Sequence, residues 1–122
     1  MNDDELRSKA ARILTILRST NFINSHPITK DLEGLPSHPG IYAVKHKSGE
    51  ILYVGKGKGL RERLKNGHKA FFWAWIEGIQ PSEVAIAFVS LSFEDWLQSL
   101  ELEVLILQRL RPRYNSQIRQ EE

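Results

Sequence analysis

Apolar positions along the chain follow helical spacing in some segments and strand spacing in others, which predicts an α/β domain. Residues 3–18 repeat apolar side chains at helical spacing behind three acidic residues, which is typical of an amphipathic helix. Residues 19–39 contain three prolines and one glycine, so we expect a connecting loop with at most a short helical turn. Further elements are expected at residues 40–46 (strand), 51–55 (strand), 60–66 (helix), 69–79 (helix), 82–91 (strand) and 92–110 (helix). This order predicts a small, mainly antiparallel sheet of three strands, flanked by helices.

The first two strands are expected to form a hairpin whose pairing follows from the turn. If the turn is centred between residues 48 and 49, Val44 faces Tyr53 and Tyr42 faces Gly55. Successive strand residues alternate faces, so Tyr42 and Tyr53 lie on the same face and Gly55 leaves open space above the Tyr42 ring. The opposite face is expected to carry Ile41, Ala43, Leu52 and Val54. A packing role for both tyrosines is the alternative, because tyrosine favours strands.

The last helix carries a glutamate in an unexpected place. With a rotation of 100° per residue, an apolar arc is formed by Trp96, Leu97, Leu100, Val104, Leu107 and Leu110. Glu103 falls inside this arc, whereas Glu101 falls on the polar side. A carboxylate on a core-facing stripe is costly unless it has a charged or metal partner. We therefore expect Glu103 to line a pocket or to contact a cation; a purely structural pairing with an arginine is the alternative.

Composition and charge exclude several functions. A chain of 122 residues fits one domain. The absence of cysteine excludes disulfides, thiolate metal sites and cysteine nucleophiles, and suits a reducing cytoplasm. No apolar run approaches the roughly 20 residues of a membrane helix, and the acidic N-terminus is unlike a secretion signal. The net charge is only +2, but residues 35–72 hold eight Lys or Arg and two acids. A basic centre favours a phosphate-rich partner, and a solvated basic surface is the alternative.

The sequence Gly-Lys-Gly-Lys-Gly at residues 55–59 raises the question of a nucleotide-binding loop. It is not a Walker loop, because no Gly-Lys-Ser/Thr ends it, and its third glycine comes one residue early for a dinucleotide fingerprint. Backbone N–H groups and lysines that follow a strand still predict weak affinity for phosphate.

The order of the motifs resembles the GIY-YIG nuclease family. The tripeptide GIY at residues 40–42 and the variant YVG at residues 53–55 are separated by ten residues. Arg63, Glu103 and Asn115 then match the family's helix arginine, metal-binding glutamate and terminal asparagine. The segments LPSHPGIY (35–42) and RPRYN (111–115) are similar to the N-terminal nuclease domain of the bacterial excinuclease C proteins. The resemblance extends over residues 35–116, with residues 1–34 as an N-terminal helical extension and linker and residues 117–122 as a C-terminal tail.

The resemblance implies hydrolysis of phosphodiester bonds with one divalent cation, Mg²⁺ or Mn²⁺, held by Glu103. Tyr42 or Tyr53 would position or deprotonate water, helped by positive charge from Lys56, Arg63 and the metal, and Arg63 would clamp the phosphate. Contacts to nucleic acid are expected from Lys56, Lys58, Arg61, His68 and Asn115. Asn115 has two alternative roles: it could fix the loop that carries the tyrosine and arginine, or cap the turn after the last helix.

One motif position departs from the family. Gly67 stands where the family has Tyr or His, one turn after the arginine, so either His68 fills that role through a small helix irregularity or the role is vacant. The expected function is a metal-dependent endonuclease acting on DNA in repair, recombination or a mobile-element context. The alternatives are a catalytically weak or inactive nucleic-acid-binding module of the same fold, and a binder of phosphorylated small molecules or proteins. We expect a cytoplasmic protein without membrane contact, whose specificity comes from a protein partner or an oligomer.

Overall fold

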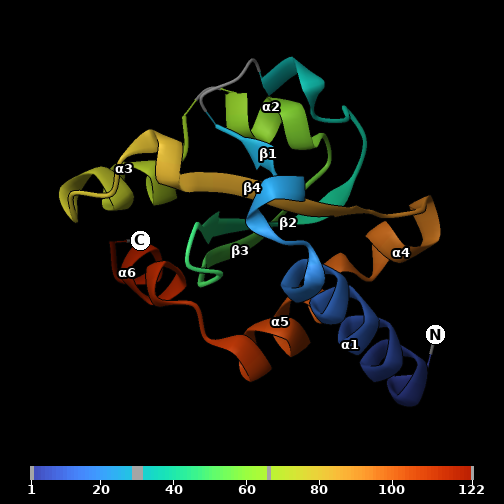
Figure 1. The fold of residues 1–122 in the computed structure, drawn as a ribbon. Helices are drawn as coiled ribbons and strands as arrows, with labels where there is room; N and C mark the ends of the chain where they lie inside the picture. The colour runs from blue at the N-terminus through green and yellow to red at the C-terminus, as the bar shows by residue number, and fades with distance from the viewer. Residues whose placement is uncertain (1, 29–31, 66, 122) are drawn as a thin grey trace.

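A computed structural model describes residues 2–28, 32–65 and 67–121, in which an antiparallel sheet lies between layers of helices (Figure 1). The elements are α1 (Asp3–Ser19), β1 (His26–Pro27), β2 (Gly40–His46), β3 (Ile51–Gly57), α2 (Leu60–Lys65), α3 (Lys69–Ile76), β4 (Val84–Ser90), α4 (Phe93–Leu97), α5 (Ser99–Leu110) and α6 (Arg113–Glu121). Short 3₁₀ turns occupy Phe22–Asn24, Leu32–Gly34 and Pro81–Glu83. No helix in this described part of the chain is both long and apolar enough to cross a membrane.

The sheet has four strands in the order β1-β4-β2-β3, so the expectation of three strands is wrong by one. The additional strand lies within residues 19–39, where a loop was expected, and pairs His26 with Ile86 and Pro27 with Ala85. Two residues that include a proline carry no alternating pattern, and only the neighbouring β4 makes them a strand. Residues 29–31 of the expected loop and residue 66 of the expected second helix lie outside the described residues.

The predicted hairpin register is confirmed over most of its length. Val44 pairs with Tyr53 and Tyr42 with Gly55, as the turn position implied. Near the turn, Lys45 pairs with Ile51, and the register shift leaves Leu52 as an extra residue on β3. A bulge of this kind reverses the alternation locally. Leu52 therefore packs with Tyr42, and the expectation that it belongs to the opposite face is wrong.

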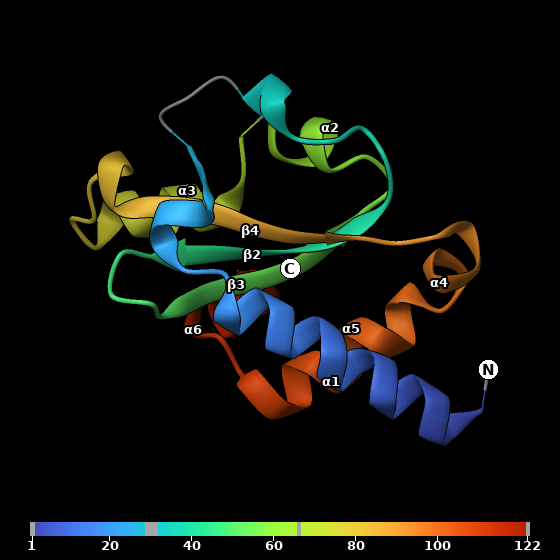
Figure 2. The same cartoon turned by 45° about the vertical axis from the view of Figure 1, so that its right-hand side comes forward.

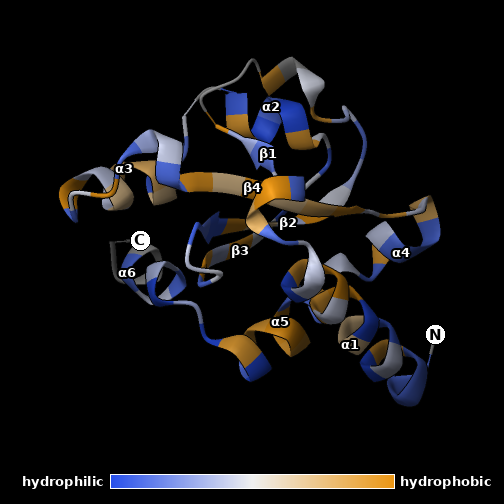
Figure 3. Ribbon diagram, viewed as in Figure 1, coloured by the Kyte–Doolittle hydropathy of each residue, from blue (hydrophilic) through white to orange (hydrophobic). Residues whose placement is uncertain are grey.

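The two faces of the sheet bury separate clusters of apolar side chains. On one face, α1 and α5 pack against Ile41, Ala43 and Val54. On the other face, residues of α2 and α3 pack against Tyr42 and Val44. Figure 2 shows α1 and α5 below the sheet and α2 above it, and Figure 3 shows how apolar residues concentrate along β4 and α5. The edge strand β3 is where side chains from both layers can meet.

A buried lysine fastens α1 to the sheet. Lys45 is only 1% exposed, and its Nζ donates to the backbone carbonyls of Leu17 (2.9 Å), Arg18 (3.2 Å) and Thr20. These carbonyls belong to the C-terminal end of a helix, which attracts a cation. Burial lowers the pKa of Lys45. One of the eight cations in the basic centre is thus a helix cap and is inaccessible to any partner.

The long helix expected over residues 92–110 is divided into α4 and α5, which meet at Gln98. Ser92 caps α4 by accepting the N–H of Asp95 at 3.1 Å, and α5 ends before Pro112, as the sequence indicated. The expected apolar arc is wrong, since its members Leu97, Leu100 and Val104 are exposed, while the buried residues of α5 are Ser99, Leu102 and Ile106. Apolar residues occur almost all round α5, so its pattern does not select a face; packing against α1 does.

Candidate active site

A buried tyrosine and a histidine form the centre of the candidate site. Tyr42 on β2 is completely buried, and its Oη lies 2.7 Å from Nε2 of His68. The chain turns at Gly67, whose φ of +88° favours glycine, and His68 then becomes the N-cap of α3. Its Nδ1 accepts the N–H of Ala70 at 3.0 Å. Of the two alternatives for this motif position, the contacts favour His68, which reaches Tyr42 after the chain turns at Gly67.

The two hydrogen bonds of His68 define its tautomer. Burial, assisted by the charge of Arg63, lowers the pKa of His68 to about 4, so the ring is neutral near pH 7. Because Nδ1 accepts a backbone N–H, we assign the ring proton to Nε2, which donates to Tyr42. Burial raises the pKa of Tyr42, and so does its hydrogen bond with Tyr53. Tyr42 therefore stays protonated, and its hydroxyl can donate a hydrogen bond to Tyr53.

Three other predicted residues, Tyr53, Arg63 and Glu103, act on this hydroxyl. Tyr53 is half-buried, with its ring centroid 6.1 Å from that of Tyr42 and 4.7 Å from that of His68. The charge of Arg63 on α2 lowers the pKa of Tyr42 and the charge of Glu103 on α5 raises it, so both lie within electrostatic reach. Glu103 is half-buried whereas Glu101 is exposed, which confirms that Glu103 is the glutamate drawn inward. Residues on β3, α2 and α5 thus lie within electrostatic reach of Tyr42 on β2.

Gly55 makes room for the paired tyrosines. A Cβ placed on Gly55 would lie 2.6 Å from Tyr42 Oη and 2.8 Å from Tyr53 Cε1, closer than side chains allow. The space that a side chain at Gly55 would occupy is therefore filled by the Tyr42 hydroxyl and the Tyr53 ring. The expectation of open space at this position is wrong. The sequence showed the glycine opposite Tyr42, but only the side-chain positions show what fills the gap.

Asn115 is committed to the edge of the sheet. Its Oδ1 accepts the N–H of Val54 at 2.9 Å, and its Nδ2 donates to the carbonyl of Val54 at 2.8 Å. The side chain therefore acts as a short additional strand partner for β3, next to Tyr53. Of the alternative roles for Asn115, the contacts favour fixing the segment that carries the tyrosine.

The three basic side chains that were predicted to contact the nucleic-acid backbone lie in different environments. Lys56 lies on the sheet face opposite the tyrosines, with its Nζ 4.7 Å from the Trp96 ring centroid. Lys56 and Arg63 were both expected to supply positive charge to the tyrosines, and it is the charge of Arg63 that acts on Tyr42. Arg61 donates through Nε to the carbonyl of Leu35 at 3.0 Å. Lys58 is exposed. Alternation along β3 explains the position of Lys56, and the loop contact of Arg61 carries no sequence signal.

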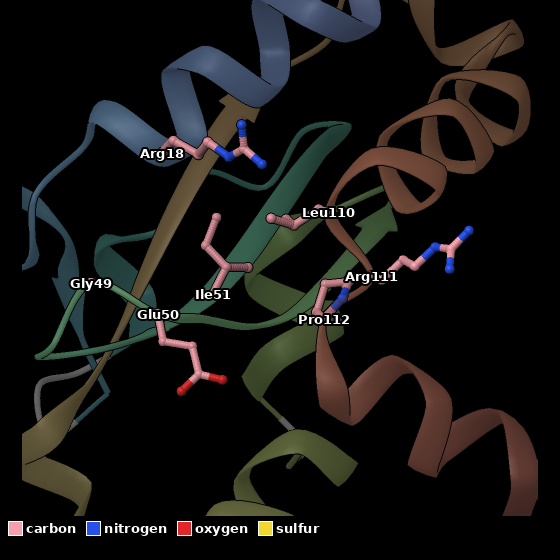
Figure 4. Close-up of a pocket in the computed structure, with 7 residues that line it drawn as sticks. All are labelled: Arg18, Gly49, Glu50, Ile51, Leu110, Arg111 and Pro112. Carbon is pink, nitrogen blue, oxygen red and sulfur yellow. The ribbon is translucent and has the colours of Figure 1, made fainter.

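A groove beside the site runs between α5 and α6. It encloses about 400 Å³ and includes Glu103, Val104, Arg111 and Asn115 in its lining. A separate hollow of about 410 Å³ lies at the hairpin turn, lined by Arg18, Gly49, Glu50, Ile51, Leu110, Arg111 and Pro112 (Figure 4). Predicted site residues line the first of these and are absent from the second. The groove therefore gives the candidate site an open approach from the α5 side.

The donor groups at the site suit a hard, hydrated cation. Glu103 supplies one carboxylate, which lies within electrostatic reach of the Tyr42 hydroxyl. Among the described residues, no group of three or more His, Cys, Asp or Glu side chains is gathered as a metal cluster. Mg²⁺ is commonly held by one or two carboxylates while it keeps several waters, whereas structural zinc needs a full set of nitrogen and sulfur ligands. The residues present thus fit Mg²⁺ or Mn²⁺.

The antiparallel sheet and the tyrosines at its edge define a domain of the GIY-YIG class. Residues 38–116 match the family model described as the UvrC-like GIY-YIG domain, and the chain belongs to this family. Among curated relatives, UvrABC system protein C of Chlorobium chlorochromatii is 32% identical over 99 residues, covering 78% of this chain and 15% of that protein. The corresponding protein of Nitratidesulfovibrio vulgaris is 33% identical over 97 residues, covering 75% of this chain and 13% of that protein.

A solved structure has the same fold. The GIY-YIG N-terminal endonuclease domain of UvrC from Thermotoga maritima, bound to its catalytic magnesium, superposes with a TM-score of 0.54 at 26% identity. The match covers 71% of this chain and 93% of that domain. The chain spans about 15% of the length of the curated relatives that it matches, and the matched family model is that of their UvrC-like GIY-YIG domain.

Proposed function

We propose that this protein is a divalent-metal-dependent endonuclease that hydrolyses phosphodiester bonds in DNA, within DNA repair. The observation that carries the proposal is that the Tyr42 and Tyr53 rings lie side by side, with Arg63 and Glu103 both within electrostatic reach of Tyr42. Membership of the UvrC-like family and similarity to the endonuclease domain of Thermotoga maritima UvrC support it. The curated relatives are much longer than this chain, so their pathway and partners are assigned to this chain only as part of the proposal.

In this proposal Tyr53 activates the attacking water. It is half-buried and accepts a hydrogen bond from Tyr42, whereas burial keeps Tyr42 protonated, so Tyr53 is the tyrosine that is open to solvent water. His68 holds Tyr42 in the orientation that donates to Tyr53. The resulting order of donors, from His68 to Tyr42 to Tyr53, assigns the base role to the second of the two tyrosines.

Arg63 and Glu103 handle charge on either side of the tyrosines. Arg63 is exposed and permanently charged, so it can offer paired N–H donors to phosphate oxygens. Glu103 would hold Mg²⁺ or Mn²⁺, which when bound supplies positive charge to the phosphate as negative charge develops. Asn115 keeps Tyr53 in register by its two bonds to Val54.

The proposed partner is the phosphate backbone of DNA, approached through the groove between α5 and α6 and the exposed Lys58. We further propose a cytoplasmic location and a protein partner or oligomer that supplies specificity, as the UvrABC system name of the relatives suggests.

An incision assay on supercoiled plasmid and on branched DNA, with Mg²⁺ or Mn²⁺ against chelator, tests this function. Glu103→Gln and Arg63→Ala should each lower the cutting rate by about 100-fold or more, because each removes charge aimed at the transition state. Glu101→Gln and Arg109→Ala, exposed on the same α5 helix, should cut like the wild type. Wild-type protein that cuts under none of these metals would leave a nucleic-acid-binding module as the function. Full cutting by Glu103→Gln would refute the assignment of the site.

A further inference from the structure

The outward face of α3 carries large apolar side chains that the fold leaves in water. Trp75 is 73% exposed, Phe72 53% and Ile76 50%. The Phe72 and Trp75 rings lie 6.3 Å apart between centroids, tilted by 34°. Figure 1 shows α3 at one flank of the molecule, beside α6. The neighbouring α3 side chains Ala70 and Ala74 fill the core, so burial inside this domain does not explain the aromatic residues.

This aromatic face lies on the helix that begins at the candidate active site. The helix that carries it starts at His68, which bonds Tyr42. The His68 ring also contacts Phe71, with centroids 5.8 Å apart, and Phe72 follows in the same turn. At 1.5 Å of rise per residue, the exposed rings lie within about two helical turns of the residue that orients the tyrosines. A strand bound at the site can therefore reach them.

The charges around the face favour a polyanion. Lys65 and Lys69 are exposed at its N-terminal end, close in sequence to Arg63. The acid at its C-terminal end, Glu77, is occupied by Arg113 (3.1 Å) and by the hydroxyl of Tyr114 (2.6 Å). Exposed aromatic rings flanked by lysines are how proteins bind single-stranded nucleic acid, because every base has a face on which to stack.

A second exposed apolar region provides the contrast. Phe93 and Leu97 on α4 are 73% and 62% exposed, but the exposed acids Glu94 and Glu101 lie near them in sequence. Acidic neighbours would repel a phosphate backbone, so this region does not suit nucleic acid.

We propose that the α3 face formed by Lys69, Phe72, Trp75 and Ile76 stacks unpaired bases of the nucleic acid whose phosphate binds at the site. The substrate class is DNA with a single-stranded segment next to the cut, such as a gap, flap or bubble. This inference rests on the proposed function, which it narrows to one kind of substrate.

The test compares binding to a single-stranded oligonucleotide and to a blunt duplex of the same length, by fluorescence anisotropy at one fixed salt concentration. A Glu103→Gln background prevents cutting. Trp75→Ala and Phe72→Ala should each weaken single-strand binding at least tenfold or so, and duplex binding less than about twofold. Trp75→Phe should keep most of the affinity, whereas Trp75→Leu, which keeps apolar area without a π face, should not. Phe93→Ala, equally exposed on α4, is the matched control and should bind like the parent.

Several results would overturn the proposal. Trp75→Leu that binds single strands as well as the parent would mean that stacking is not the contact. Unchanged oligonucleotide affinity in Trp75→Ala, with altered sedimentation, would identify the face as a protein interface instead. Wild-type cutting of plasmid and branched DNA, measured separately, shows whether the proposed nuclease function holds. An active nuclease whose cutting of gapped DNA is unaffected by Phe72→Ala and Trp75→Ala would refute the stacking inference alone.

Discussion

Replacing His68 by asparagine separates the two hydrogen bonds of this side chain. Asparagine is among the best N-cap residues, so its Oδ1 should accept a backbone N–H at the start of α3, as Nδ1 of His68 now does. The shorter side chain cannot reach Tyr42, whose completely buried hydroxyl then loses its donor. A buried polar group left without its partner costs about 1–3 kcal/mol. The variant should be less stable than the wild type by that amount at pH 7.5.

The same substitution should change the response to acid. The pKa of His68 is lowered to about 4 in the folded protein, below its value of 6.5 in the unfolded chain. The unfolded chain therefore binds the proton more tightly, and the folded state loses stability as pH falls from about 6.5 towards 4. Between pH 7.5 and pH 5 this amounts to about 2 kcal/mol for the wild type, and His68→Asn removes it. The difference in free energy of unfolding between the wild type and His68→Asn should therefore shrink by that amount at pH 5, and can reverse sign.

Urea unfolding followed by tryptophan fluorescence, on both proteins at pH 7.5 and pH 5, measures this gap directly. Other titrating groups affect both proteins alike and cancel in the difference. A gap that stays constant between the two pH values would refute the conclusion that His68 is buried and neutral. Cutting by His68→Asn is expected to fall while α3 stays folded, which amide exchange in that helix can verify.

Two further predictions concern side chains that hold the site in place. Asn115→Ala removes two hydrogen bonds to Val54 and should destabilise the protein by about 1–3 kcal/mol. It should also slow cutting by about 10- to 100-fold, because Tyr53 is the adjacent residue; wild-type cutting and stability in this variant would contradict the positioning role. Lys45→Met should leave the carbonyls at the end of α1 without donors, costing about 1–3 kcal/mol in urea unfolding and speeding amide exchange there. Lys47→Met, at an exposed position, is its control, and equal stability of the two variants would refute the capping role of Lys45.

Local patterns were sufficient for the hairpin and for the motif residues on it. The turn position determined that Val44 faces Tyr53 and Tyr42 faces Gly55, because pairing in a hairpin follows from its turn. The same reasoning placed both tyrosines on one face. The order of motifs along the chain was also enough to indicate the family to which residues 38–116 belong. Each of these conclusions depends on spacing within a short segment or on residue identity.

Contacts between distant segments decided the rest. Lys45 belongs by sequence to a basic stretch, yet it caps a helix that ends more than 20 residues earlier. The short strand β1 exists only because β4 lies beside it, and α5, apolar on most sides, buries the face that α1 covers. His68 reaches Tyr42 because the chain turns at Gly67, between α2 and α3, and directs the ring inward. Burial, tautomer and pKa at the site are properties of these long-range contacts, and no local pattern in the sequence encodes them.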